Sequence, residues 1–453
     1  MKNKMRRLET LSFYDHTGIE KHLARMAQKG WMIEHITNQF WTYRKIEPKE
    51  YEFAVTYYPK ATDFDPGPSD KQQTFYDFCT RTGWELACTW FQMQIFYNIS
   101  ENPVPIDTDP VYEVETIHKA CKANYLRGYI LLLILGAVGT FFFFSGMIGH
   151  TLRLLSSPSS MVLYPGSFLL FLFCAVELIT YFSWHKRAAK AAQDGIFMDT
   201  PSTAVFQKAI LVALVALVLF WIVNLLFGKN PLMAVIAVLV FAAIFLTKVS
   251  VNAVKQFLKR KKVSAGLNRV LTVLASFVIA FVLMGMAIQA GISLSEIPAF
   301  SESFRIGEPP LKIEDLMDTS YQGYVTLLSP DTSLLLSRLG VEQRRHFDDE
   351  LSAGIPHMEY DISQVNIPGL YHFFENQMKR TVLLGYGNGA QLTEVSRDLF
   401  GAVKAYSLMG IDGEPLNRYV LCYNNMLVDI EFNWSLTEDQ MSIVGEKLSG
   451  RID

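Results

Sequence analysis

The sequence predicts a multi-domain membrane protein: an N-terminal α+β domain, a block of five transmembrane helices and a C-terminal α+β domain. Three observations predict this fold class. Five long uncharged runs lie between Gly128 and Ser295, a pattern occurs twice before them, and a strand-rich acidic region follows them. We place the three parts at residues 1–124, 125–293 and 294–453.

Each uncharged run is close to the ~20 residues that a helix needs to cross ~30 Å of hydrocarbon. An odd number of spanning helices places the two ends of the chain on opposite sides of the membrane. A hidden sixth helix would undo that argument. We expect the five helices at about 128–149, 160–184, 209–228, 230–247 and 270–293.

Charge is unevenly distributed and predicts the orientation. Up to Ile292 the chain has 29 Lys and Arg against 20 Asp and Glu, a net +9, whereas the remainder has 12 against 24, a net −12, which together give −3. The loop Lys248–Arg269 carries seven basic residues and no acid, whereas the opposite loops hold only Arg153 and Lys229. The positive-inside rule therefore predicts a cytoplasmic N-terminus and an extracytoplasmic C-terminal domain in a bacterial plasma membrane.

The N-terminal domain contains an internal repeat. Gly18–Trp31 matches Lys71–Trp84 at a separation of 53 residues (71 minus 18). Ile19, Leu23 and Met26 recur at the spacing of a helix with one buried face. Both copies end in Gly-Trp, and glycine tolerates the left-handed conformation that ends a helix.

Strand-like runs surround each of these helices, so the predicted unit is βαββ, used twice. We expect the two units to form one antiparallel sheet with both helices on one face, in a ferredoxin-like layout. The Gly-Trp pairs either line a ligand groove or belong to the core. The expected strands are Leu8–Tyr14, Trp31–Thr37, Gln39–Ile46, Tyr51–Tyr58, Trp84–Trp90 and Gln92–Asn98.

A short polar helix is expected at Asp107–Asn124. It runs almost directly into the first spanning helix, so it either carries movement between the two parts or serves as a plain spacer. No cleavable signal peptide is expected, because the basic residues at the start are not followed by an apolar run.

The sequence resembles the uncharacterised bacterial membrane protein family called domain of unknown function 2812. The resemblance rests on FYDHTGIEKHLARMAQKGWMIE near the start, on TGWELA in the second copy, on the hydrophobic block and on LSRLG at Leu336–Gly340. It implies a membrane protein found near PadR-type transcriptional regulators, and hence a role in a regulated envelope response. The family has no established catalytic residues to carry over.

Three polar residues inside the spanning segments are candidate functional or packing residues. Glu177 is the only acidic residue in a spanning segment, and burying a charge in hydrocarbon is costly. It either couples ion or proton movement or meets a basic side chain of a neighbouring helix. Asn224 and Gln289 are weaker candidates, because single amides commonly join helices by hydrogen bonds.

The basic stretch Lys255–Lys262 either binds anionic lipid headgroups or carries ordinary topogenic charge. Paired broken helices are typical of transporters, and here only Pro165-Gly166 interrupts a span.

The C-terminal region predicts an α+β domain. Strands are expected at Tyr321–Leu328 and in a three-strand meander, a short helix at Gln391–Phe400, and a last helix at Thr437–Leu448 with a capping box from Thr437 to Gln440. The meander strands are Val403–Met409, Arg418–Tyr423 and Met426–Phe432. Five scattered cysteines form no disulfide framework.

The motifs that resemble active sites are incomplete. Gly385–Gly389 is glycine-rich but lacks the Lys-Ser/Thr of a P-loop. Carboxylates near His346 and His357 offer a divalent-cation site without HExxH spacing or a cysteine set. Those carboxylates are Asp348, Asp349, Glu350, Glu359 and Asp361. We therefore assign no catalytic, cofactor-binding or metal residue, and expect no enzyme.

These observations predict a sensor or regulatory protein that relays an envelope signal, or the binding of a partner, between the outer and cytoplasmic domains. The alternatives are a transport or efflux component with Glu177 as coupling residue, and an accessory scaffold of a membrane complex. Expected partners are the lipid bilayer, another membrane protein or a PadR-type regulatory pathway, without direct nucleic-acid binding.

Overall fold

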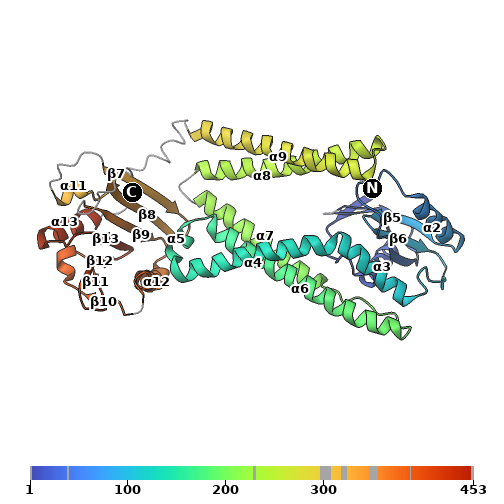
Figure 1. Cartoon of the computed structure of the whole chain (residues 1–453), viewed down its shortest axis with the longest axis horizontal. Coiled ribbons are helices and arrows are strands. Elements are labelled where there is room, and N and C mark those ends of the chain that lie inside the picture. The colour runs from blue at the N-terminus through green and yellow to red at the C-terminus, as the bar shows by residue number, and fades with distance from the viewer. Residues whose placement is uncertain are drawn as a thin grey trace. The chain divides into compact units, whose positions relative to one another are not determined.

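The computed structural model of the chain (Figure 1) describes residues 3–37, 40–100, 102–227, 231–295, 308–317, 324–345, 356–387 and 389–449. The chain forms two compact units. The N-terminal unit comprises Met1–Val138, Ser167–Ala216 and Val240–Met286. The C-terminal unit comprises Gly139–Gly166, Leu217–Leu239 and Ala287–Asp453.

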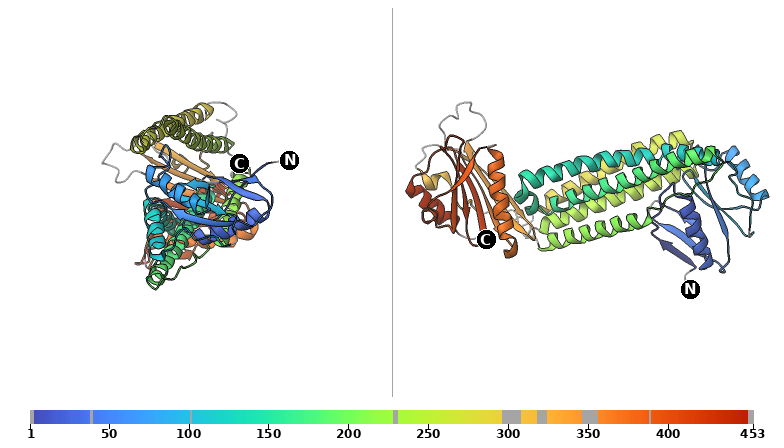
Figure 2. Two further views of the ribbon diagram at one scale, coloured as in Figure 1. Left: turned by 90° about the vertical axis from the view of Figure 1, so that its right-hand side faces the viewer. Right: turned by 90° about the horizontal axis from the view of Figure 1, so that it is seen from below.

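Among the residues that the structure describes, five helices are long and apolar enough to span a membrane, which agrees with the predicted number and with the interpretation as a multi-pass membrane protein. They can be followed in Figures 1 and 2. Helix α6 extends nine residues beyond its predicted end, because the Ala- and Lys-rich stretch after Trp184 favours helix. The five are α4 (Tyr125–Gly149), α6 (Ser160–Gln193), α7 (Ala204–Phe227), α8 (Pro231–Arg260) and α9 (Ala265–Ser295).

The N-terminal domain has the predicted element order, βαββ twice. The first copy is β1 (Lys4–Arg7), α1 (His16–Gln28), β2 (Trp31–Ile36) and β3 (Trp41–Lys45). The second is β4 (Glu52–Tyr57), α2 (Asp70–Arg81), β5 (Glu85–Trp90) and β6 (Met93–Asn98). Helix α3 (Pro110–Ala123) follows, with Asp109 as its N-cap.

The glycine before each tryptophan ends its helix as predicted. Gly30 has φ +82° and Gly83 has φ +89°, in the left-handed region that favours glycine. The strand predicted at Leu8–Tyr14 is wrong, because the first strand lies earlier, at Lys4–Arg7. Ser12 to Asp15 are all buried, so this segment lacks the alternation of a strand.

The six strands form two three-stranded antiparallel sheets, ordered β1-β3-β2 and β4-β6-β5, instead of the single sheet predicted. The adjoining edge strands β2 and β5 both carry a bulge, between Ile33 and His35 in one copy and between Leu86 and Cys88 in the other. A bulge bends and twists its strand, which opposes continued pairing along that edge. The two bulges are again 53 residues apart (86 minus 33).

One hydrophobic core joins the N-terminal domain to the neighbouring ends of the long helices. It contains α1 residues such as Leu23, the α3 residue Ile117, Tyr125 of α4, and Tyr181 and Trp184 of α6. The part of α6 that follows Glu177 is therefore a packing surface for the domain, and the helix and the domain share a core within one unit.

The C-terminal domain is built on a seven-stranded antiparallel sheet ordered β10-β11-β12-β13-β9-β8-β7. The predicted meander is confirmed as β11 (Lys404–Met409), β12 (Pro415–Cys422) and β13 (Met426–Phe432). The helix predicted at Gln391–Phe400 is wrong: β10 (Gln391–Glu394) joins the sheet edge and a 3-10 turn, η2 (Arg397–Phe400), follows. The other strands are β7 (Tyr324–Thr332), β8 (Leu336–Arg345) and β9 (Met358–Val365).

Both faces of this sheet are covered within the C-terminal unit. Successive residues of β13 point to opposite faces of the sheet and belong to different cores, Val428 to one and Leu427 to the other. Helices α11 (Ile313–Leu316) and α13 (Glu438–Leu448) cover the first face, and α13 has the predicted capping box. Helices α5 (Thr151–Ser156) and α12 (Tyr371–Gly385), with η1 (Pro368–Leu370), lie on the second.

Candidate functional site

Glu177 lies at the centre of a buried polar cluster in the N-terminal unit. Its carboxylate is fully buried, and Oε2 accepts hydrogen bonds from Ser12 Oγ at 2.7 Å and from the Tyr125 hydroxyl at 2.9 Å. Oε1 accepts from Gln207 Nε2 at 3.0 Å and from the Thr203 hydroxyl. We call these five residues the Glu177 cluster. Four neutral donors therefore satisfy the carboxylate, and the predicted basic partner is not needed.

The residues Ser12–His16, which we call segment 12–16, run from this cluster to the start of α1. After Ser12, the ring of Tyr14 lies 5.1 Å from the ring of Tyr181. Asp15 Oδ1 accepts a hydrogen bond of 2.6 Å from Thr200 in the α6–α7 connection. This short segment thus contacts α6 and the loop that follows it at several points.

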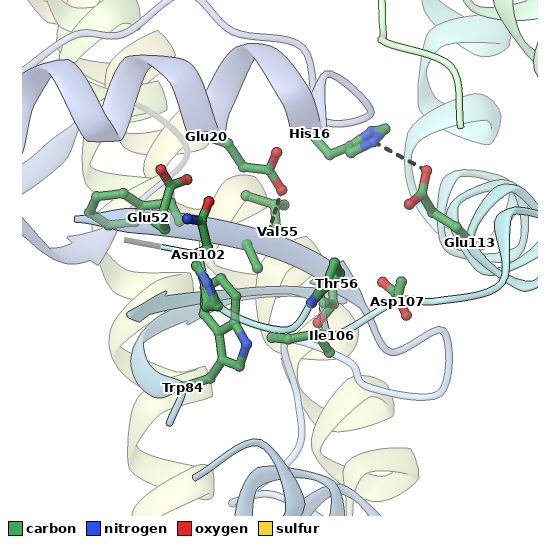
Figure 3. A pocket seen from close by; sticks show the side chains of 14 residues that line it. His16, Glu20, Glu52, Val55, Thr56, Trp84, Asn102, Ile106, Asp107 and Glu113 are labelled. Atoms are coloured by element: carbon green, nitrogen blue, oxygen red, sulfur yellow. Dashed lines mark hydrogen bonds and ion pairs between the residues drawn. The ribbon is translucent and has the colours of Figure 1, made fainter. Parts of the chain in front are cut away.

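Segment 12–16 ends at an acidic pocket of about 400 Å³ in the same unit (Figure 3). His16, Glu20, Glu52, Asp107 and Glu113 are its titratable lining residues. Helix α1 supplies the first two residues one turn apart, β4 supplies Glu52, and the chain around the start of α3 supplies the last two. Four carboxylates and one imidazole thus share one hollow.

Burial changes the protonation of this pocket. It raises the pKa of Glu20 to about 7, although the Val55 backbone N–H donates a 2.8 Å hydrogen bond to this carboxylate. Burial, with the nearby charge of Glu113, raises the pKa of Asp107 to about 6. Burial alone lowers the pKa of His16, but its contact with Glu113 at 3.4 Å outweighs this and the pKa is raised.

A second cavity, of about 420 Å³, lies in the C-terminal unit. It is lined by α5, α12 and the charged half of one sheet face. There Arg338 donates to Asp361 at 2.5 Å, and Arg418 donates to Asp429 at 2.7 and 2.9 Å. Arg153 of α5 lies on its wall. This cavity offers charges of both signs beside the connection between α4 and α6.

The other predicted intramembrane residues have different surroundings. Asn224 is fully buried on α7: it donates to the Phe220 carbonyl at 3.1 Å and accepts from the Leu334 N–H at 2.9 Å. It therefore joins α7 to the turn between β7 and β8, as a packing amide does. Gln289 is exposed on α9. Neither lies in the Glu177 cluster.

Among the proposed cation ligands, Asp348, Asp349 and Glu350 lie outside the described residues. Glu359 and Asp361 both line the C-terminal cavity, but Asp361 is paired with Arg338. No group of three or more metal-ligating side chains is found among the described residues. The glycine-rich segment begins at Gly385, the last residue of α12, and Gly387 and Gly389 have positive φ.

The basic stretch before α9 contacts the second copy of the repeat. Lys255 forms an ion pair with Asp63, and Lys259 donates to the Asp63 carbonyl at 3.3 Å. Asn268 donates to the Phe64 carbonyl at 3.1 Å. At least part of this charge therefore binds the N-terminal domain.

Sequence reasoning identified Glu177 but missed the acidic pocket. Its carboxylates come from α1, β4 and the segment before and within α3, and no spacing in the sequence relates them. Trp84 was the one residue that indicated this pocket in advance, because the Gly-Trp pairs were candidates to line a ligand groove. It lines the pocket and is also core, 3% exposed, with its indole N–H donating to the Val104 carbonyl at 2.9 Å.

The fold and these sites define a multi-pass membrane protein that carries an N-terminal α+β domain and a C-terminal seven-stranded sheet domain. Residues 15–128 match the family model described as "Protein of unknown function (DUF2812)", so the chain carries a DUF2812 domain there. The match begins within segment 12–16 and runs from α1 through the second copy of the repeat to α3. No curated protein and no solved structure matches the chain.

Proposed function

We propose that this chain is a membrane-embedded regulatory protein that relays a signal between its C-terminal domain and its DUF2812 domain. The DUF2812 domain lies in the cytoplasm and the C-terminal domain outside, as the distribution of basic residues predicts. The signal is an envelope ligand or a partner, and the charged cavity beside α5 is the candidate receiving site.

The contacts of segment 12–16 carry this proposal. Ser12 hydrogen-bonds Glu177 of a spanning helix, and four residues later His16 contacts Glu113 in the acidic pocket. A shift or rotation of α6 therefore displaces one end of the segment and changes the pocket at the other. Movements of one to two ångströms at packed helices are enough for such switching.

The second repeat supports the same view. Its Asp63 and Phe64 bind the end of α8 and the start of α9, whereas segment 12–16 binds α6 and its connection to α7. The DUF2812 domain thus contacts two separate pairs of helices, and relative movement of these pairs would be transmitted to both repeats.

The transport alternative requires Glu177 to exchange protons or ions with water. A fully buried carboxylate with four hydrogen-bond donors, one of them from the N-terminal domain, favours a positioning role instead. A substrate-accumulation assay distinguishes the two. Transport coupling predicts that Glu177→Gln abolishes accumulation at unchanged protein level, whereas the relay predicts no accumulation that depends on Glu177.

Hydrogen exchange in lipid nanodiscs tests the relay directly. Removal of Leu311–Asp453 should change amide protection in segment 12–16 and α1, because it removes the domain that is proposed to control the conformation of the spanning helices. Glu177→Gln should reduce that response, whereas Glu115→Gln, an exposed acid on α3, should leave it intact. Unchanged protection after the truncation would refute the relay.

Sidedness has its own test. A reporter that is active only in the cytoplasm should work when fused before Met1 and fail when fused after Asp453. The reverse result would contradict the proposed direction.

A further inference from the structure

The acidic pocket holds more negative charge than its own residues neutralise. Among its described lining residues, the four carboxylates face one basic group, His16. Burial is the main cause of the raised pKa values of Glu20 and Asp107, and the neighbouring charge of Glu113 raises both further. A bound cation would stabilise the ionised carboxylates.

Two further lining groups also suggest a ligand. The hydroxyl of Thr56 is buried, with the residue 5% exposed, and has no hydrogen-bond partner in the described part of the chain. Leaving a buried hydroxyl unpaired is costly, so a ligand that donates to it gains affinity. The Trp84 indole, fixed by its bond to the Val104 carbonyl, adds an aromatic surface of the kind that attracts organic cations.

The arrangement of the carboxylates favours an extended cation over a metal ion. In Figure 3, Glu20 and Glu52 lie at one end of the pocket, and Asp107 and Glu113 lie at the other, with Thr56 between them. A divalent metal needs several oxygens within about 2.6 Å, and no such group of three is found among the described residues.

We propose that the acidic pocket binds a linear diamine or polyamine, with one ammonium group at Glu20 and Glu52 and another at Asp107 and Glu113. The chain between the ammonium groups lies along β4 and passes Trp84 and Thr56. The inference deepens the proposed function, since such an amine would occupy the pocket at the end of segment 12–16 and act as its cytoplasmic effector.

Isothermal titration of the full chain in nanodiscs of zwitterionic lipid at pH 7.5 tests this proposal. The probe is 1,4-diaminobutane, compared with 1-aminobutane and MgCl₂. The diamine should bind at least roughly tenfold more tightly than the monoamine, since the monoamine loses one charge-assisted contact. Magnesium at the same concentration should not displace it.

Variants locate the binding. Glu20→Gln and Asp107→Asn should each weaken diamine binding by roughly tenfold or more, and Thr56→Val by a few-fold. Glu20→Gln keeps an oxygen that accepts from the Val55 N–H, so the fold is preserved. Glu115→Gln on the exposed side of α3 is the matched control and should bind as the parent chain does.

Absence of diamine binding, equal binding of the monoamine, or full affinity in both Glu20→Gln and Asp107→Asn would overturn the proposal. Amide protection of α1 identifies any variant that is misfolded, and Thr56→Val then provides the independent pocket variant. Failure of the relay is detected separately, because the truncation and Glu177→Gln experiments change no residue of the pocket.

Discussion

The two copies of the repeat have the same local structure but different burial. Their element order and sheet order are the same, and their bulges and helix-ending glycines are each 53 residues apart (86 minus 33, 83 minus 30). Helix α1, however, buries Ile19, Leu23 and Met26 in the large core shared with α6. Helix α2 buries Gln72 and Cys79 and leaves Phe78 56% exposed. The repeat therefore determines the backbone, whereas contact with the spanning helices determines which copy is central.

This difference indicates a division of roles between the copies. Helix α1 of the first copy is joined to α6 through the large core, and Ser12 joins α6 through the Glu177 cluster. The second copy shares that core through strand residues such as Val55, but it contacts α8 through the partly exposed Asp63–Lys255 ion pair and α9 through the hydrogen bond from Asn268. We expect the first copy to follow any movement of the helices closely and the second to detach more easily.

Substituting Glu177 and Asp63, which bind the first and the second copy to the spanning helices, should give the largest difference in stability between the copies. Glu177→Leu removes the acceptor that Ser12, Tyr125, Thr203 and Gln207 share, and the first three of these are buried. The local stability of α1 should therefore fall by about 3 kcal/mol, since each unpaired buried group costs about 1–3 kcal/mol. Asp63→Ala breaks an ion pair whose side chains are 17% and 31% exposed, and should cost α2 about 1 kcal/mol or less. Hydrogen exchange of both helices measures the two effects. Equal losses would contradict the proposed hierarchy.

Truncating one large apolar side chain on each helix should separate the copies next. Leu23→Ala on α1, at a residue 1% exposed, should cost about 2–5 kcal/mol because it leaves a cavity in the shared core. Phe78→Ala on α2 should change stability by about 0.5 kcal/mol or less, as surface substitutions usually do. Protection of the corresponding amides gives both values. A large loss at Phe78 would mean that α2 has a partner in the membrane assembly.

The pH dependence of stability should differ between the copies because Glu20 of the first corresponds to Gln73 of the second (20 plus 53). Burial raises the pKa of Glu20 to about 7, so the folded state holds its proton over a range in which the unfolded chain releases it. Stability of α1 should therefore decrease as pH rises from about 4.5 to 7, by up to about 3 kcal/mol, and stay lower above that range.

Glu20→Gln should remove this decrease and make the first copy resemble the second. The measurement is amide protection of α1 between pH 5 and pH 8, after correction for intrinsic exchange. A parent chain that gains stability as pH rises through this window would show that another group dominates.

Much of the local fold could be predicted from the sequence, since helix periodicity, Gly-Trp ends and apolar runs are properties of neighbouring residues. The hydrogen bonds that Glu177 accepts could not be predicted, because their donors lie at positions 12, 125, 203 and 207. These are ordinary polar residues that no regular spacing relates. The single sheet was wrongly predicted for a similar reason. Pairing between β2 and β5 depends on bulges, which the alternation of side chains does not reveal.

The smallest difference between the copies is expected where their backbone conformations agree, at the glycines that end α1 and α2. Gly30→Ala and Gly83→Ala each place a Cβ on a left-handed residue, which costs about 1–2 kcal/mol. The new Cβ would lie 3.0 Å from the Ile46 carbonyl in the first copy and 3.1 Å from the Asn98 side chain in the second. Because a backbone carbonyl yields less than a side-chain amide, the first substitution should cost slightly more. Gly67→Ala, with nothing within 4 Å, is the control and should be nearly neutral. A cost confined to one copy would show that burial, and not the shared backbone conformation, fixes these turns.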